Sequence, residues 1–183
     1  MTDQELEQST RAAEASAPAE PVVSEADQKL IEKYERSFTG NFAHSLDSKG
    51  RMVVPLAFRD MLGKVFTITP SFDFKSIAIY PEVAYVRMRE RYARLYDELG
   101  SSEILEYLQW LDAFTFRAQE CDGQGRVLLP ARLRQEMLGE DKEVDIMGSG
   151  DHLRVLTHVD CVSSFASFRN GIQGNLSAMN LRR

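Results

Sequence analysis

The sequence has 183 residues with an apolar share of 43%, which suffices for one or two small globular domains. No apolar run approaches the ~20 residues of a membrane span, and the only cysteines, Cys121 and Cys161, follow no secretion signal; we therefore expect a reduced, cytoplasmic protein without a membrane partner. The formal net charge of -6 argues, taken alone, against a nucleic-acid partner.

The negative charge is concentrated in the first 36 residues. This segment holds nine acidic and four basic residues, a balance of -5, which leaves -1 for the rest of the chain. It is rich in Ala, Ser, Pro and Glu and contains few large apolar side chains, so we predict a disordered acidic extension over residues 1–36, with a short charged helix at 27–36. The nearly neutral remainder is compatible with a locally basic face.

Residues 38–80 read as a β-rich unit with one short helix. Weak alternation predicts a strand over 41–46, a turn over 47–50 and a second strand over 51–54, together a hairpin closed by a type I turn with a glycine bulge. Pro55 is suited to the first turn of a helix that ends at Gly63. Two further strands are predicted over 65–69 and 76–80.

The apolar period then becomes helical. Apolar residues over 81–99 predict one helix that stops at Gly100, and Ser101 or Ser102 can cap a second helix running to about residue 114. A second β-rich unit follows, with strands over 117–121, 126–129, 143–147 and 152–157 and a helix over 130–138. The polar segment from residue 170 onward is expected to be a mobile tail.

One pentapeptide occurs in both β units. Asp47-Ser48-Lys49-Gly50-Arg51 is followed by an apolar triplet and Pro55, and Asp122-Gly123-Gln124-Gly125-Arg126 is followed in the same way by Pro130. The two copies indicate an internal duplication and hence a function that uses a doubled site.

These motifs resemble the bacterial MraZ family of transcriptional regulators. The resemblance covers roughly residues 38–165 and includes the Ile79-Tyr80-Pro81 step, the Leu133-Arg134-Gln135 run and the helical spacer. It implies an α+β fold made of two tandem SpoVT-AbrB-like modules, each half of a swapped-hairpin β-barrel, related by a pseudo-twofold axis. The modules are expected at 38–88 and 116–165, with the helical spacer at 82–115 and the mobile tail at 170–183.

The resemblance also implies a function. It points to a ring-shaped homo-oligomer that binds double-stranded DNA at promoter direct repeats, is associated with the nucleoid, and mainly represses the division and cell-wall gene cluster containing its own gene. The DNA-binding residues carried over by the motif are Lys49, Arg51 and Arg126. Gln124 leaves the second loop without a lysine, so that loop could serve the fold more than DNA.

Chemistry supports different roles within each loop. Arginine offers a planar fork that can meet guanine O6 and N7, whereas Lys49 offers a point charge suited to phosphate. Asp47 and Asp122 are expected to hold the turns and to orient the arginines, and Gly50 and Gly125 to provide the left-handed backbone that the turns need.

The sequence is compatible with a second class of function and argues against a third. A protein-interaction module of the antitoxin type, without a DNA role, could receive a partner helix on the apolar stripe at 104–114. An enzyme is not expected, because no phosphate loop, zinc signature or nucleophile elbow occurs, and neither a cofactor, a metal nor a small-molecule substrate is predicted.

Overall fold

The computed structural model describes residues 24–25, 28–29 and 37–176. The chain divides into residues 1–35 and 36–183, and all the named elements belong to the second unit. Most of the acidic extension predicted at 1–36, and residues 177–183 of the predicted tail, lie outside the described residues.

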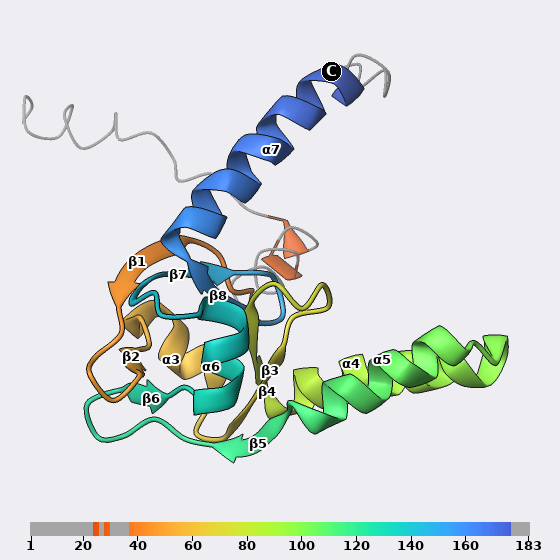
Figure 1. The fold of residues 1–183 in the computed structure, drawn as a ribbon, viewed down its shortest axis with the longest axis horizontal. Helices are drawn as coiled ribbons and strands as arrows, with labels where there is room; N and C mark the ends of the chain where they lie inside the picture. The colour runs from red at the N-terminus through yellow and green to blue at the C-terminus, as the bar shows by residue number, and fades with distance from the viewer. Residues whose placement is uncertain (1–23, 26–27, 30–36, 177–183) are drawn as a thin grey trace, which may run out of the picture. The chain divides into compact units, whose positions relative to one another are not determined.

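The first repeat contains four strands and one helix (Figure 1). Its elements are β1 (Asn41–Ser45), β2 (Arg51–Val53), α3 (Leu56–Leu62), β3 (Phe66–Pro70) and β4 (Ile77–Pro81). The second repeat has the same order, with β5 (Phe116–Gln119), β6 (Arg126–Leu128), α6 (Ala131–Leu138), β7 (Glu143–Gly148) and β8 (Leu153–Thr157).

A helix follows the last strand of each repeat. The first copy leads into α4 (Glu82–Leu99), which packs against α5 (Ser102–Ala113), and Figure 1 shows the two running alongside each other. The Ser101 hydroxyl caps α5 by accepting from the Ile104 N–H. The second copy leads into α7 (His158–Leu176), which includes residues 170–176 of the predicted mobile tail. The residues of α7 are a weak predictor of a helix, because its serines and glycines are poor helix formers.

The strands of the described region form one six-stranded antiparallel sheet and one two-stranded ribbon. The sheet order is β1-β7-β8-β4-β3-β5, and the ribbon pairs β2 with β6. If each strand is replaced by its equivalent in the other repeat, the same strand order is obtained in reverse. The strand pairing therefore has a pseudo-twofold pattern. The coarse prediction of an α+β fold is confirmed by the mixture of helices with a mainly antiparallel sheet.

The prediction that β1 and β2 pair with each other as a hairpin is wrong. β1 instead makes a five-residue antiparallel ladder with β7, and β2 pairs with β6. Only the turn between them forms locally, through the bonds from Gly50 N to Asp47 O and from Asp47 N to Arg51 O. Pairing between the repeats, over five residue pairs for β1 and three for β2, thus replaces pairing within the unit.

Two apolar clusters cover opposite faces of β4. Ile77 and Ile79 join the main core between the sheet, the ribbon, α3 and α6. Ala78 and Tyr80 point the other way and pack with residues of α4 and α5 in a smaller cluster. This alternation follows from the two-residue period of a strand. The main core therefore packs against one face of the ribbon, and the other face of the ribbon is exposed.

Candidate functional site

The loop of the first repeat is organised by the carboxylate of Asp47. Its Oδ1 accepts from the backbone N–H of Lys49 at 2.9 Å and of Arg51 at 3.0 Å. Its Oδ2 accepts from Nε of Arg51 at 2.7 Å. The backbone N–H of Arg51 is the largest cause that lowers the pKa of Asp47, to about 2. The aspartate therefore stays ionised and holds both the turn and the arginine.

The second loop repeats this geometry. Asp122 Oδ1 accepts from the backbone N–H of Gln124 at 2.9 Å and of Arg126 at 3.0 Å, and Oδ2 accepts from Nε of Arg126 at 2.8 Å. The backbone N–H of Arg126 is again the largest cause that lowers the pKa of the carboxyl. Each loop is thus held by two bonds from backbone N–H groups, and each arginine side chain is fixed by one bond through Nε.

The ribbon places both arginines on one face. Arg51 lies opposite Leu128, and Arg126 lies opposite Val53, with the pair Met52 and Val127 between them. Met52 and Val127 are buried, so the alternation of a strand directs the other four side chains outward. Arg51 and Arg126 are diagonal neighbours, with Cα atoms roughly 7–8 Å apart.

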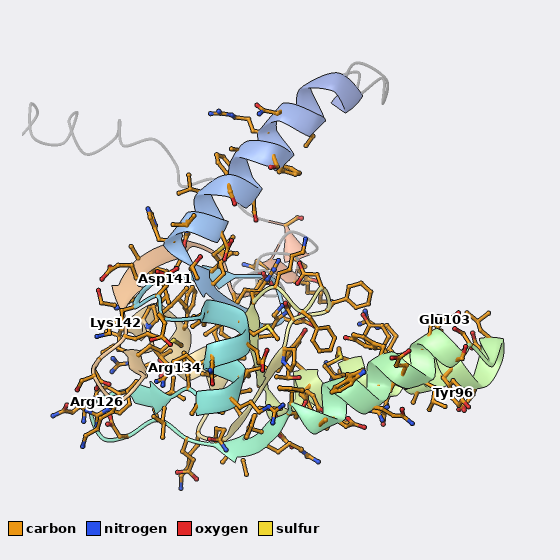
Figure 2. The ribbon with its side chains drawn as sticks, in the orientation of Figure 1. Tyr96, Glu103, Arg126, Arg134, Asp141 and Lys142 are labelled. Atoms are coloured by element: carbon orange, nitrogen blue, oxygen red, sulfur yellow. The ribbon has the colours of Figure 1, made fainter. Side chains whose placement is uncertain are left out.

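The two guanidinium groups are partly exposed. The side chains of Arg51 and Arg126 retain 27% and 29% of their accessible surface, and Figure 2 shows Arg126 at the outer side of β6. Within the described region, the hydrogen bonds of both arginines to other side chains run through Nε alone. The terminal nitrogens, which form the planar fork, thus donate to no acceptor of another side chain in the part of the chain that is described.

The loop tips differ between the repeats. Lys49 and Gln124 occupy equivalent positions, and both are exposed. The first tip therefore carries a cation and the second a neutral amide that can donate and accept hydrogen bonds. The sequence placed these residues correctly in the two loops, but the contacts of their side chains with a ligand stay a prediction.

The glycines of the loops have left-handed backbones, with φ of +78° at Gly50 and +74° at Gly125. A Cβ built on Gly50 would lie 1.2 Å from Nη1 of Arg134, and a Cβ on Gly125 would lie 2.1 Å from Cζ of Arg59. Each loop is thus in contact with an arginine from the helix of the other repeat. The positive φ favours glycine at both positions.

Arg59 and Arg134 were not among the predicted site residues. Arg59 donates from Nε to the Val54 carbonyl at 2.8 Å, and both arginines are partly buried. The signal that could have identified them is their position, because each stands four residues after the proline that ends the motif. They add two cations beside Lys49, Arg51 and Arg126, so five cationic side chains lie in or next to the two loops, together with the carboxylates of Asp47 and Asp122.

A polar cavity of about 360 Å³ lies beside the first loop. Asp47, Ser48 and Gly50 form one wall, and α6 with the segment after it forms the other. Figure 2 labels Arg134 on α6 and, farther along the chain, Asp141 and Lys142. Side chains of both charges line this cavity, so it favours neither an anionic nor a cationic ligand.

The remaining titratable residues of the described ranges form no comparable site. Among the described residues no group of three or more His, Cys, Asp or Glu side chains is placed to hold a metal ion. In the arginine-rich segment of α4, Arg89 binds Asp112 through two nitrogens and Arg94 binds Glu90. These pairs indicate a solvated helix face. None of the helices described is both long enough and apolar enough to cross a membrane.

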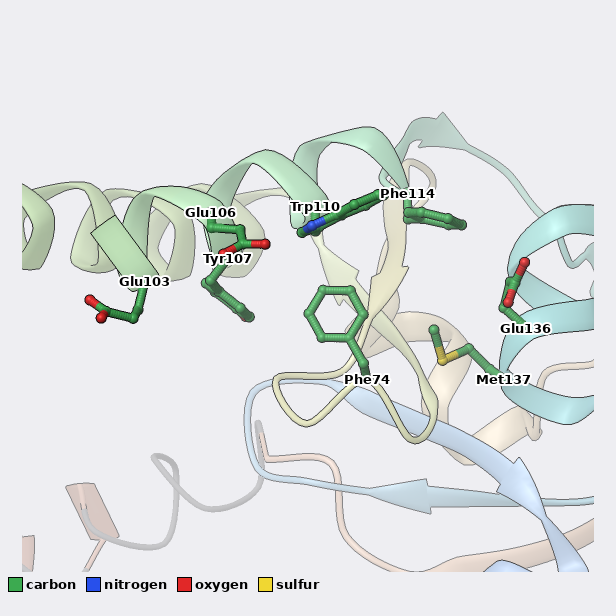
Figure 3. A pocket seen from close by; sticks show the side chains of 8 residues that line it. All are labelled: Phe74, Glu103, Glu106, Tyr107, Trp110, Phe114, Glu136 and Met137. Carbon is green, nitrogen blue, oxygen red and sulfur yellow. The ribbon is translucent and has the colours of Figure 1, made fainter. Parts of the chain in front are cut away.

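A second cavity, of about 390 Å³, lies along α5 (Figure 3). Tyr107, Trp110 and Phe114 line it from α5, Phe74 from the β3–β4 loop, and Met137 from α6. The carboxylates of Glu103, Glu106 and Glu136 also belong to its lining. Trp110 is 54% exposed, so the aromatic stripe of α5 is only partly covered by the chain itself.

Comparison with known proteins relates the chain to one family. The family model described as "MraZ protein, putative antitoxin-like" matches residues 116–159. A protein of Lactiplantibacillus plantarum named transcriptional regulator MraZ is 37% identical over 122 residues, which is 64% of this chain and 80% of that protein. A protein of the same name from Lachnoclostridium phytofermentans is 34% identical over 61% of this chain and 74% of that protein. Another, from Leuconostoc mesenteroides, is 32% identical over 64% of this chain and 79% of that protein.

These matches confirm the resemblance drawn from the paired motifs. Because these relatives, more than 30% identical, are covered over 74–80% of their own length, the likeness extends well beyond one loop. The chain belongs to the MraZ family of transcriptional regulators.

Proposed function

We propose that the chain regulates transcription by binding double-stranded DNA with the outer face of the β2–β6 ribbon and its two loops. The observation that carries this proposal is the placement of Arg51 and Arg126 on one exposed face, each held through Nε by its own aspartate. A two-stranded ribbon fits the major groove, and an arginine fork can meet guanine O6 and N7 there.

The roles of the loop residues follow from their geometry. Arg51 and Arg126 contact base edges, and Lys49 at the exposed tip contacts phosphate. Asp47 and Asp122 stay out of contact with DNA, because their oxygens are engaged within the loop. Arg59 and Arg134, which lie against the loop glycines, add positive potential on the same side.

Self-association strengthens a weak contact. One ribbon offers few base contacts, but several ribbons held at a fixed spacing bind repeated sites at high effective concentration. We therefore propose a ring-shaped homo-oligomer acting on direct repeats upstream of its own gene, in a division and cell-wall gene cluster. The main effect is repression, with the protein located at the nucleoid.

A mobility-shift titration with the chain's own upstream DNA tests this proposal. We expect wild type to shift this fragment, with an affinity that falls steeply as salt rises, because phosphate contacts release counterions. Arg51→Ala combined with Arg126→Ala should abolish the specific shift, whereas Arg94→Ala, at an exposed arginine of α4 that pairs with Glu90, should leave it intact. Equal shifts by the double variant and wild type would refute the assignment.

A protein-interaction module without a DNA role is the second candidate. The cavity along α5, with its exposed Trp110, favours it, because apolar and aromatic surface of this kind is typical of protein contacts. Co-purification of a stoichiometric protein partner, with no retention on heparin or on the upstream DNA, would favour this alternative over DNA binding.

A further inference from the structure

Two aliphatic side chains share the outer face of the ribbon with the arginines. Val53 follows Arg51 by two residues and is 37% exposed, and Leu128 follows Arg126 by two residues and is 55% exposed. The two are equivalent positions of the repeat, so the same arrangement of one arginine and one aliphatic residue occurs twice on one surface.

The core does not require aliphatic residues at these positions. Met52 and Val127 fill the inner face of the ribbon, each at 1% exposure, whereas Val53 and Leu128 are outside the main apolar cluster. An exposed apolar side chain alone needs no explanation. Here, however, both lie next to the proposed base-reading groups, as cross-strand partners of Arg126 and Arg51.

The chemistry of DNA supplies an apolar ligand for such residues. In the major groove the C5-methyl group of thymine is the apolar feature of a base edge, and aliphatic side chains contact it. Residues two apart on a strand are separated by roughly 6.7 Å, which matches two base steps at about 3.4 Å per step. A ribbon that sets Arg51 against a guanine thus brings Val53 near the base about two steps away.

We propose that Val53 and Leu128 are specificity-determining residues that recognise thymine methyl groups about two base steps from the guanines contacted by Arg51 and Arg126. This inference rests on the proposed DNA-binding function. It adds thymine as the second recognised base. The competing explanation is that the two residues only cover the aliphatic stems of the neighbouring arginines across the ribbon.

The test replaces thymine by uracil, which removes only the methyl group and leaves the protein unchanged. Footprinting on the chain's own upstream DNA first locates the bound segment, and duplexes are then made with uracil at single thymines inside it or, as the control, outside it. Wild type should lose about fourfold in affinity for each recognised methyl group. Uracil outside the segment should have no effect.

Polar variants that lack a methyl group link the effect to the residues. Val53→Ser should bind the thymine and uracil duplexes equally at one position, and Leu128→Asn should do so at another, with thermal unfolding midpoints close to that of wild type. If wild type binds the segment specifically but ignores every uracil substitution, the inference is overturned and the proposed function stands. If both variants retain the fourfold discrimination, the assignment to Val53 and Leu128 is overturned. If wild type binds no upstream DNA, the proposed function fails with it.

Discussion

Replacing Arg51 by lysine separates the charge of the side chain from its shape. The variant keeps one positive charge beside the first loop, so the electrostatic attraction to phosphate is preserved. It removes the planar fork and the bond from Nε to Asp47 Oδ2 at 2.7 Å, which fixes the direction of that fork. If Arg51 contacts a base as proposed, the loss of affinity therefore falls on base recognition rather than on phosphate attraction.

The magnitude follows from the contact removed. A bidentate arginine–guanine pair contributes about 1–3 kcal/mol of discrimination. Lysine retains part of it, so we expect a loss of about 1–2 kcal/mol on the specific site, or roughly 5- to 30-fold in Kd. The ion pair with Asp47 is partly exposed, so its loss should leave the thermal unfolding midpoint close to that of wild type.

The assay is a titration of specific and unrelated duplexes over a series of salt concentrations. Arg51→Lys should weaken specific binding, keep the salt slope and leave binding to unrelated DNA unchanged. Lys49→Ala is the matched counterpart. It should weaken binding to both duplexes equally and reduce the slope of log affinity against log salt concentration by about 1. If Arg51→Lys binds the specific duplex as tightly as wild type, Arg51 does not read a base.

Three further outcomes concern the loops and the repeats. Gly50→Ala should lower the free energy of unfolding by roughly 1–2 kcal/mol, because alanine is strained at a positive φ while the Arg134 guanidinium can swing away. Gly100→Ala is the control, since Gly100 has a positive φ but open space around it, and it should lower the free energy by a similar amount. A much larger thermal destabilisation at Gly50 would contradict this. The lowered pKa of Asp47 contributes stability that is present above the ordinary value of 3.8 and lost as pH falls toward 2, so Asp47→Asn should flatten the melting temperature over that window; an unchanged acid profile would argue against it. A fragment of residues 37–99 should either remain unfolded or dimerise, because β1 and β2 pair only with the other repeat, and a folded monomer by circular dichroism and sedimentation would disprove that dependence.

The local features were predictable from the sequence. The turn at Asp47 and Gly50 has a strong signature, because the carboxylate and the glycine each satisfy a definite requirement of the backbone. The apolar period likewise predicted α4 and α5, and the serine before α5 marked its start. These signals lie within a few residues of the structure that they specify.

The partners of the strands were not predictable in the same way. The period of β1 indicates a strand, but nothing in its residues distinguishes β2, five residues away, from β7, almost one hundred residues away. The contacts of Arg59 and Arg134 with the loop glycines depend on that pairing, so they could not be inferred without it. Position within the repeat was the only available signal.

The covalent joining of the two repeats has a consequence for the ribbon. If two identical chains supplied β2 and β6, any change in one loop would be copied into the other, and both ends of the ribbon would stay alike. In a single chain the equivalent tips can differ, and here they do, with Lys49 at one and Gln124 at the other. Under the proposed DNA-binding function, the tether thus frees the protein from matching a strictly palindromic sequence and gives the ribbon a direction along its target.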